Sequence, residues 1–297
     1  MTVAVLGSAN MDLVAYVATA PRLGETVTGR EFRTVPGGKG ANQAIAAARA
    51  GAPVRFLGAV GDDAFGPRLA ATLRDAGCDT SRLRTVPGAS GIAHIVVDNA
   101  GGNSIIVIPG ANGTVTDLSA EDVDAIAASA ALLLQLELPM PGVLAGARAA
   151  HDAGVPVILT PAPAVPLTDD LLGAVDLLVP NEHEAAALTG FDDPSRAAAA
   201  LLDAVPEVVV TLGDAGSVYH TRTGPPLRIP AFPADAVDTT AAGDTFVGAL
   251  AARRAEGAPM PEALRFAAAA AALSVQRPGA SSSMPTRAEI DALAGAR

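Results

Sequence analysis

The sequence predicts an α/β fold in which a doubly wound, mostly parallel sheet is flanked by helices and accompanied by a small β-sheet lid. From residue 119 onward, helical and strand patterns alternate along the chain. The expected strands are short and almost continuously apolar, as in Val208-Val209-Val210, which is typical of strands buried on both faces of a parallel sheet. Polar residues follow several of these strands, so a ligand site is expected at the carboxyl edge of the sheet.

The N-terminal half is expected to supply the first core strands and the lid. Strands are predicted at 3–6 and 54–60, with one helix ending near Ala50 and another over 65–76. Cys78 is placed at the end of that second helix, after Gly77, and is expected to be inert. Residues 92–97 and 104–108 form a predicted hairpin, and the region 14–35 reads as strands with turns. A lid sheet formed by about 12–35 and 91–110 is therefore expected within a single domain covering 1–297.

The C-terminal half carries the alternation that defines the fold class. The predicted helices are 119–129, 141–153, 182–189, 195–204 and about 245–256, and the predicted strands are 132–136, 155–159, 176–179 and 207–211.

Composition restricts the partners. The net charge of −11 and the pI near 4.7 argue against nucleic acid or an anionic membrane as a partner. A single cysteine excludes an intramolecular disulfide and a cysteine-based metal cluster, which favours a cytoplasmic setting. No secretory signal is visible at the N-terminus, and the alanine-rich runs are too short to span a bilayer.

One stretch, Asp238-Thr239-Thr240-Ala241-Ala242-Gly243-Asp244-Thr245-Phe246, is predicted to carry the chemistry. Small residues at the start of a helix let backbone N–H groups meet an anion, and the helix dipole adds to the attraction. The carboxylate of Asp244 repels phosphate, so it is expected to meet a hydroxyl that must lose a proton. The alternative is that Asp244 only caps the helix.

Further polar residues gather at the same predicted edge. Asn10 and Asp12 are two apart after the first strand and suit the vicinal hydroxyls of a sugar, although they also fit a polar turn. The run Pro36-Gly37-Gly38-Lys39-Gly40-Ala41-Asn42 lets the backbone approach a ligand, but it lacks the spacing of a Walker loop, and no G-x-G-x-x-G follows a strand. The remaining strand-end residues are Glu137, Asn181, Glu184, Thr211 and Gly213.

With these residues in view, the chain resembles the ribokinase-like (PfkB) carbohydrate kinases over essentially its whole length. Both signatures of that family are present, the run from Pro36 to Ala44 and the run from Asp238 to Phe246. Family members more often carry Gly-Ala-Gly-Asp where this chain has Ala241-Ala242-Gly243-Asp244. This departure keeps the backbone donors, so the anion site is expected to survive.

The resemblance implies ATP-dependent phosphorylation of D-ribose at O5, giving ribose 5-phosphate and ADP. Asp244 would be the general base, and the backbone N–H groups of Ala241, Ala242, Gly243 and Asp244 would form the anion hole. The implied sugar ligands are Asn10, Asp12, Gly38, Lys39, Asn42, Glu137 and Asp244. The implied nucleotide ligands are Asn181, Glu184, Thr211, Gly213, Gly216 and Gly243, with the Asn181/Glu184 pair organising Mg²⁺.

The resemblance also implies a monovalent-cation site, normally for K⁺, partly made by backbone carbonyls. Its residues would be Asp238, Thr240, Ser274, Arg277, Gly279 and Ser283. The lid would pair two subunits into a homodimer. Because the chain has no tryptophan and few aromatic residues, the adenine pocket is expected to be aliphatic, with candidates near 267–275.

Two alternatives remain open at this stage. One is a kinase for a related sugar or nucleoside, such as deoxyribose, another pentose or fructose. The other is a sugar-binding regulator without turnover, although a mere binder needs no general base.

Overall fold

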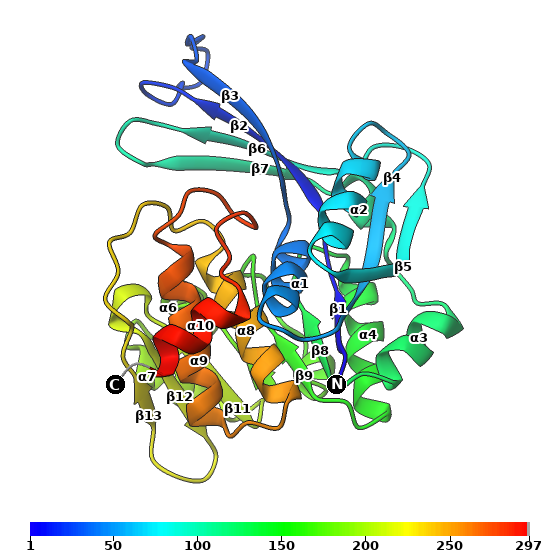
Figure 1. Cartoon of the computed structure of the whole chain (residues 1–297), viewed down its shortest axis with the longest axis vertical. Helices are drawn as coiled ribbons and strands as arrows, with labels where there is room; N and C mark the ends of the chain where they lie inside the picture. The colour runs from blue at the N-terminus through cyan, green and yellow to red at the C-terminus, as the bar shows by residue number, and fades with distance from the viewer. Residues whose placement is uncertain (296–297) are drawn as a thin grey trace.

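Nine strands form the large sheet of the computed structural model, which describes residues 1–295 of the chain (Figure 1). In spatial order they are β13 (Leu227–Ile229), β12 (Ser217–Thr221), β11 (Glu207–Thr211), β10 (Leu177–Leu178), β9 (Val157–Leu159), β8 (Ala131–Leu134), β1 (Val3–Leu6), β4 (Val54–Gly61) and β5 (Cys78–Val86). All pairs from β11 to β5 are parallel, and β12 and β13 add antiparallel strands at one edge. The mostly parallel, doubly wound class is thereby confirmed.

Helices cover both faces of this sheet, because successive strand residues point to opposite sides. In β8, Leu133 packs in one core, whereas Leu132 and Leu134 pack in the other. The first core includes α1 (Lys39–Arg49), α2 (Gly66–Asp75), α8 (Ala242–Ala255), α9 (Met260–Ser274) and α10 (Arg287–Gly295). The second includes α3 (Ala120–Ala127), α4 (Met140–Asp152), α5 (Asp169–Leu172), α6 (Glu182–Thr189) and α7 (Pro194–Leu201). Within residues 1–295, no helix has the length and apolar character needed to cross a bilayer.

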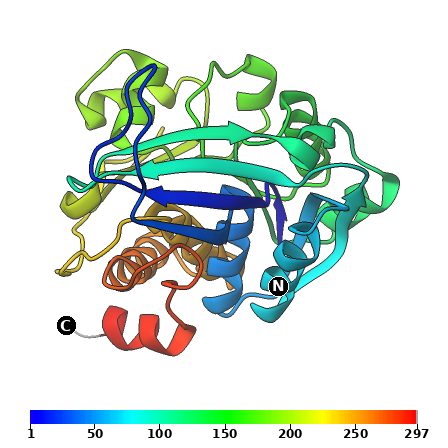
Figure 2. The ribbon, with the colours of Figure 1, turned by 90° about the horizontal axis from the view of Figure 1, so that it is seen from above.

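A second, four-stranded sheet forms the lid. Its order is β3 (Glu31–Gly37), β2 (Asn10–Tyr16), β6 (Gly91–Val97) and β7 (Asn103–Ile108). The predicted hairpin is present as β6 and β7, while β2 and β6 pair in parallel. Figure 1 shows these strands at the top of the molecule, and Figure 2, seen from above, shows them crossing in front of the helices. Strand β2 follows β1 directly, so Asn10 and Asp12 lie where the chain passes from the carboxyl edge of the large sheet into the lid.

The prediction for Cys78 is wrong in its structural part. Cys78 begins β5 instead of ending a helix, and the segment 78–86 was not predicted to be a strand. This edge strand is only partly buried and carries Asp79, Arg82 and Arg84, so it lacks the continuous apolar run of the central strands. Burial raises the pKa of the Cys78 thiol to about 12, which keeps it protonated and unreactive.

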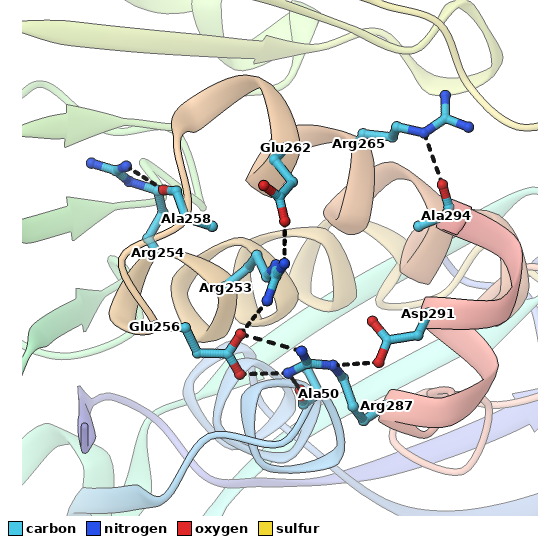
Figure 3. Close-up of polar contacts among 10 residues, drawn as sticks. All are labelled: Ala50, Arg253, Arg254, Glu256, Ala258, Glu262, Arg265, Arg287, Asp291 and Ala294. Atoms are coloured by element: carbon cyan, nitrogen blue, oxygen red, sulfur yellow. Dashed lines mark hydrogen bonds and ion pairs between the residues drawn. The ribbon is translucent and has the colours of Figure 1, made fainter. Parts of the chain in front are cut away.

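The C-terminal helix α10 is fastened to the core by a network of ion pairs (Figure 3). Arg287 donates to Glu256 at the end of α8, to Asp291 one turn further along α10 (2.8 Å), and to the carbonyl of Ala50 (3.2 Å). Arg253 in turn lies between Glu256 and Glu262. Shared charges in such a network hold α10, and the loop that precedes it, against α1 and α8.

Candidate active site

Two cavities meet at the N-terminus of α8, at the carboxyl edge of the parallel strands. The larger, of about 620 Å³, extends along α9, and the smaller, of about 190 Å³, reaches Lys39 and Asp244. Their walls share Thr211, Thr239, Ala242 and Gly243. An elongated ligand in the large cavity therefore reaches the small one only by passing the start of this helix.

The first turn of α8 has the geometry of an anion site. Helix α8 begins at Ala242, three residues before the predicted start, and Ala242 N–H closes a turn on the carbonyl of Thr239 (3.2 Å). Among the described residues, no acceptor faces the N–H groups of Gly243 and Asp244, as expected for a helix start. Gly243 lines both cavities, and a Cβ there would meet no atom within 4 Å. Both N–H groups can therefore meet a phosphate oxygen.

Ala241 is the strained residue of this turn. With φ of 58° it is left-handed, and it is the only non-glycine residue with positive φ among residues 1–295. An L-residue in this conformation costs roughly 1–2 kcal/mol. The alanine at 241, a mild departure on sequence grounds, therefore carries a backbone cost that the family's more usual glycine avoids.

Asp244 is buried, with 8% of its surface exposed, and lies at the floor of the smaller cavity. Its Oδ2 accepts from Asn42 Nδ2 (3.2 Å) and its Oδ1 from Gln43 Nε2 (3.1 Å). Burial raises the pKa of Asp244 to about 6, while the nearby Lys39 ammonium and these two amides act to lower it. The carboxylate is thus basic enough to take a proton and still ionised at neutral pH. Capping alone does not account for a first-turn acid held by two side chains of α1.

Lys39 stands among three carboxylates. Burial acts to lower the pKa of Lys39, but the charges of Asp244, Glu137 and Glu184 outweigh it and raise the pKa. Glu137 Oε2 accepts from the backbone N–H of Lys39 (2.9 Å) and from the hydroxyl of Ser8. Burial and the charges of Glu137 and Asp244 raise the pKa of Asp12 to about 7. The ammonium therefore compensates an otherwise strongly negative pocket.

Asn10 and Asp12 lie on β2, with their side chains on the same face of the extended strand. The Oδ1 of Asn10 accepts from Asn112 Nδ2 (2.7 Å), which leaves the Asn10 amide hydrogens to donate. Gly38 has a φ of 92°, and a Cβ there would lie 2.8 Å from the backbone nitrogen of Asn10, so only glycine fits. Asn42 Oδ1 is buried without a hydrogen-bond partner within residues 1–295, as expected if a ligand hydroxyl completes it.

Asn181 and Glu184 form a capping box at the start of α6. Asn181 Oδ1 accepts from Glu184 N–H (2.8 Å), and Glu184 Oε2 accepts from Asn181 N–H (2.9 Å). Both residues also line the smaller cavity. Burial raises the pKa of Glu184, with the Asn181 hydrogen bond and Lys39 acting against it. The pair therefore caps α6, and the other carboxylate oxygen of Glu184, Oε1, remains available beside the cavity.

The larger cavity has the size and lining of a nucleotide site. Thr211, Gly213 and Gly216 line it, as predicted, together with Ala268, Ala271, Ala272 and Val275 from the segment expected to meet adenine. The expectation of a purely aliphatic wall is wrong, because Phe232 and Phe246 also line the cavity. An aromatic ring at this wall gives a base a stacking surface.

The predicted cation-site residues lie at the last residue of α9, Ser274, and on two loops that are bonded to each other. Asp238 accepts from Gly279 N–H (2.8 Å) and from Thr240 N–H (2.9 Å), and the N–H groups of Val237 and Asp238 donate to Val275. Arg277 donates its guanidinium to Glu289, so only its carbonyl is offered to this loop pair. The hydroxyls of Ser274 and Ser283 each donate to a carbonyl three residues earlier. Backbone carbonyl oxygens of these segments are candidate cation ligands.

Several residues that contact the site were missed from the sequence. They are Ser8, Gln43, Asn112, Gln135 and Thr160, all buried. Gln135 had a visible signal, since it interrupts the run Leu132-Leu133-Leu134-Gln135-Leu136 with a polar side chain. Gln43 and Asn112 carry no spacing signal, because their partners are far away in sequence.

Comparisons with known proteins show the family to which the chain belongs. The pfkB family carbohydrate kinase model matches residues 1–287. A ribokinase of Haemophilus influenzae is 43% identical over 296 residues, covering 97% of this chain and 96% of the relative. The structure of Arabidopsis thaliana ribokinase complexed with ribose and ATP has a TM-score of 0.94 at 38% identity, covering 99% of each chain. A deoxyribokinase of Salmonella typhimurium is 37% identical over 298 residues, covering 96% of each.

Proposed function

The chain belongs to the pfkB family of carbohydrate kinases, and we propose that its site transfers the γ-phosphoryl group of ATP to O5 of D-ribose. The enzyme is an ATP-dependent sugar kinase. The observation that carries the residue assignment is the meeting of the two cavities at the start of α8, with Asp244 on the floor of the smaller one. ATP occupies the larger cavity, and ribose lies beside Asp12, Lys39 and Asn42.

In the reaction, the 5-hydroxyl of ribose loses its proton to Asp244 while its oxygen bonds to the γ-phosphorus. The bond from that phosphorus to the β-phosphate oxygen breaks, and ADP leaves. The N–H groups of Gly243 and Asp244 stabilise charge on the transferring phosphoryl oxygens. Lys39 neutralises the carboxylates that would otherwise repel the incoming phosphate. The lid excludes water and so favours transfer to sugar over hydrolysis.

The residues present fit both implied cations. Within residues 1–295 no group of three His, Cys, Asp or Glu side chains is placed to hold a metal ion. Mg²⁺ commonly binds through one or two carboxylates together with substrate phosphates. Glu184 would supply that carboxylate, and Mg²⁺ would neutralise the phosphates. A K⁺ ion would be held by carbonyl oxygens of the bonded loops at Asp238 and Gly279, and its charge would support the anion site.

The function is tested by measuring ADP formation with ATP, Mg²⁺, K⁺ and a panel of sugars. We expect ribose to stimulate ADP release well above the hydrolysis background, and more than deoxyribose, fructose or a nucleoside. The free-sugar assignment rests on Asn10, Asp12, Lys39 and Asn42, which suit a sugar with adjacent hydroxyls. Preference for deoxyribose would move the assignment to the runner-up substrate. ATP turnover that no sugar stimulates would favour a binding protein.

Glu184→Gln separates the metal role of this residue from its capping role. Glutamine still accepts from the N–H of Asn181, so α6 keeps its cap, but the charge beside the phosphates is lost. We expect the Mg²⁺ concentration for half-maximal activity to rise roughly 3- to 10-fold, the loss of a modest electrostatic contact. A Mg²⁺ titration that superimposes on that of the unmodified enzyme contradicts the role.

The pH dependence of activity follows from the raised pKa values of two acids in the site. Burial raises the pKa of Asp244 to about 6, and burial with neighbouring charges raises that of Asp12 to about 7. The base acts only when ionised, so kcat/KM for ribose should rise with pH through this range and level off above it. A steady-state profile with no acid limb between those two values would argue against Asp244 as the base.

The assembly and location are part of the same proposal. Strand β7 is an edge of the lid and exposes Ile105, Ile106 and Val107, with Phe32 exposed on β3 at the opposite edge. Such apolar edges are typical of surfaces that pair with another copy. We expect a homodimer through the lid. A cytoplasmic setting suits an ATP-dependent enzyme with one free cysteine.

A further inference from the structure

We propose that Gln43 is a positioning residue for the general base and that Gln135 holds the Gln43 amide in its working orientation. This inference rests on the proposed function. Gln43 Nε2 donates to Asp244 Oδ1 (3.1 Å) and to Thr160 Oγ1 (3.2 Å), and Gln135 Nε2 donates to Gln43 Oε1 (2.7 Å). Gln43 and Gln135 are buried, at 0% and 1% exposed. Two hydrogen bonds thus connect Gln135, directly after β8, to the base through the interior, and a third joins Gln43 to Thr160.

The carboxylate of Asp244 fixes which group donates in each of these hydrogen bonds. An ionised carboxylate only accepts hydrogen bonds, so the end of Gln43 that faces Asp244 must be its NH₂ group. The carbonyl of Gln43 then faces Gln135, which must present its own NH₂ group. Turning either amide would oppose two oxygen atoms. Both glutamines are therefore oriented for an ionised Asp244.

The series of hydrogen bonds from Gln135 to Asp244 has a cost in folding free energy. Gln135 Oε1 is buried without a hydrogen-bond partner within residues 1–295, which costs free energy in an apolar interior. A Cβ at Gly7 would lie 2.2 Å from this oxygen and 2.6 Å from Gly40 Cα, so glycine leaves the room that the amide needs. The amide is explained by what it does to Gln43, not by stability.

Several groups besides Gln43 affect the ionisation of Asp244. Lys39 of α1 favours the ionised form, whereas Glu137 after β8 and Asp12 of β2 carry charge of the same sign as Asp244. Gln43 also favours the ionised form and fixes Oδ1 in space. Each carboxylate oxygen can accept more than one hydrogen bond, so capacity remains for the sugar hydroxyl. The Gln43 amide thus positions the Asp244 carboxylate and favours its ionised form.

The test compares Gln43→Met and Gln135→Met with the unmodified enzyme. Methionine keeps approximate volume and removes the hydrogen bonds. We measure kcat and ribose KM from about pH 5 to 9, and ribose affinity by calorimetry. For Gln43→Met we expect kcat at pH 7 to fall roughly 10- to 100-fold, as for a lost hydrogen bond to a charged group, with KM nearly unchanged and the acid limb of kcat moved to higher pH. Gln135→Met should also lower kcat and move the acid limb to higher pH, but by smaller amounts than Gln43→Met.

Two further comparisons make the outcome decisive. The double variant should resemble Gln43→Met alone, because Gln135 acts only through Gln43. His220→Leu removes another buried polar side chain, on β12, and should leave the kcat profile unchanged. Lower thermal stability with unaltered kcat and acid limb in both methionine variants would overturn the inference. Should Gln43→Met fail to fold, Gln135→Met alone decides. Failure of the proposed function is distinct, since the unmodified chain would then lack ribose-dependent turnover.

Discussion

Replacing Asp244 with asparagine is expected to lower kcat by roughly 10²- to 10⁴-fold, the usual contribution of a positioned general base. Asparagine has nearly the same shape but cannot take a proton from the sugar hydroxyl. The dissociation constant for ribose should stay within about threefold, because Asp12, Lys39 and Asn42 keep their contacts. Single-turnover kinetics and calorimetry measure these two quantities separately.

The matched control for this variant is Asp193→Asn. Asp193 is also an acid at a helix start, where it caps α7 by accepting from the N–H of Arg196 (2.8 Å). Asparagine caps a helix about as well as aspartate, so this variant should keep normal turnover and stability. If Asp244→Asn behaves like Asp193→Asn, then Asp244 only caps α8 and the base lies elsewhere.

Replacing Lys39 with methionine is expected to lower kcat/KM by roughly 10²- to 10³-fold, as when a charged phosphate-site residue is lost. Without the ammonium, the carboxylates of Asp244, Glu137 and Glu184 repel one another and the phosphates of ATP. The pKa of Asp244 should then rise further, so the acid limb of kcat/KM moves to higher pH. Steady-state kinetics over a range of pH measures both effects.

Lys39→Arg is the control for charge alone. Arginine keeps the positive charge but is larger and planar, so it should restore the position of the acid limb while recovering only part of the rate. A Lys39→Met enzyme with a normal acid limb would show that the ammonium does not govern Asp244.

The sequence was sufficient for individual elements where a segment carries a continuous apolar run or clear helix caps. The central strand at 207–211 and the helix at 182–189 have the predicted bounds, because one is a continuous apolar run and the other is capped at both ends. Strand β5 was missed because an edge strand has one covered face and tolerates charge. Element identity was thus clearest where the core dictates the residue type.

For the site, the sequence marked residues that the structure brings together where small or charged residues interrupt a local pattern. Asp244 and Lys39 line the same cavity, and Asn42 donates to Asp244, although their motifs are far apart in the sequence. Gln43 was missed although it is adjacent to Asn42, because its role depends on Gln135, which only the fold brings near. The strain at Ala241 was likewise invisible, since it depends on a backbone angle and not on residue type.

The central claim is that Asp244 receives the proton of the sugar hydroxyl that attacks ATP. The most direct measurement is a crystal structure of the chain with ribose and a non-hydrolysable ATP analogue. We expect ribose O5 within about 3.2 Å of a carboxylate oxygen of Asp244, on the line to the γ-phosphorus, and the γ-phosphate against the N–H groups of Gly243 and Asp244. Ribose bound with O5 turned away from Asp244, or a γ-phosphate far from the start of α8, would contradict it.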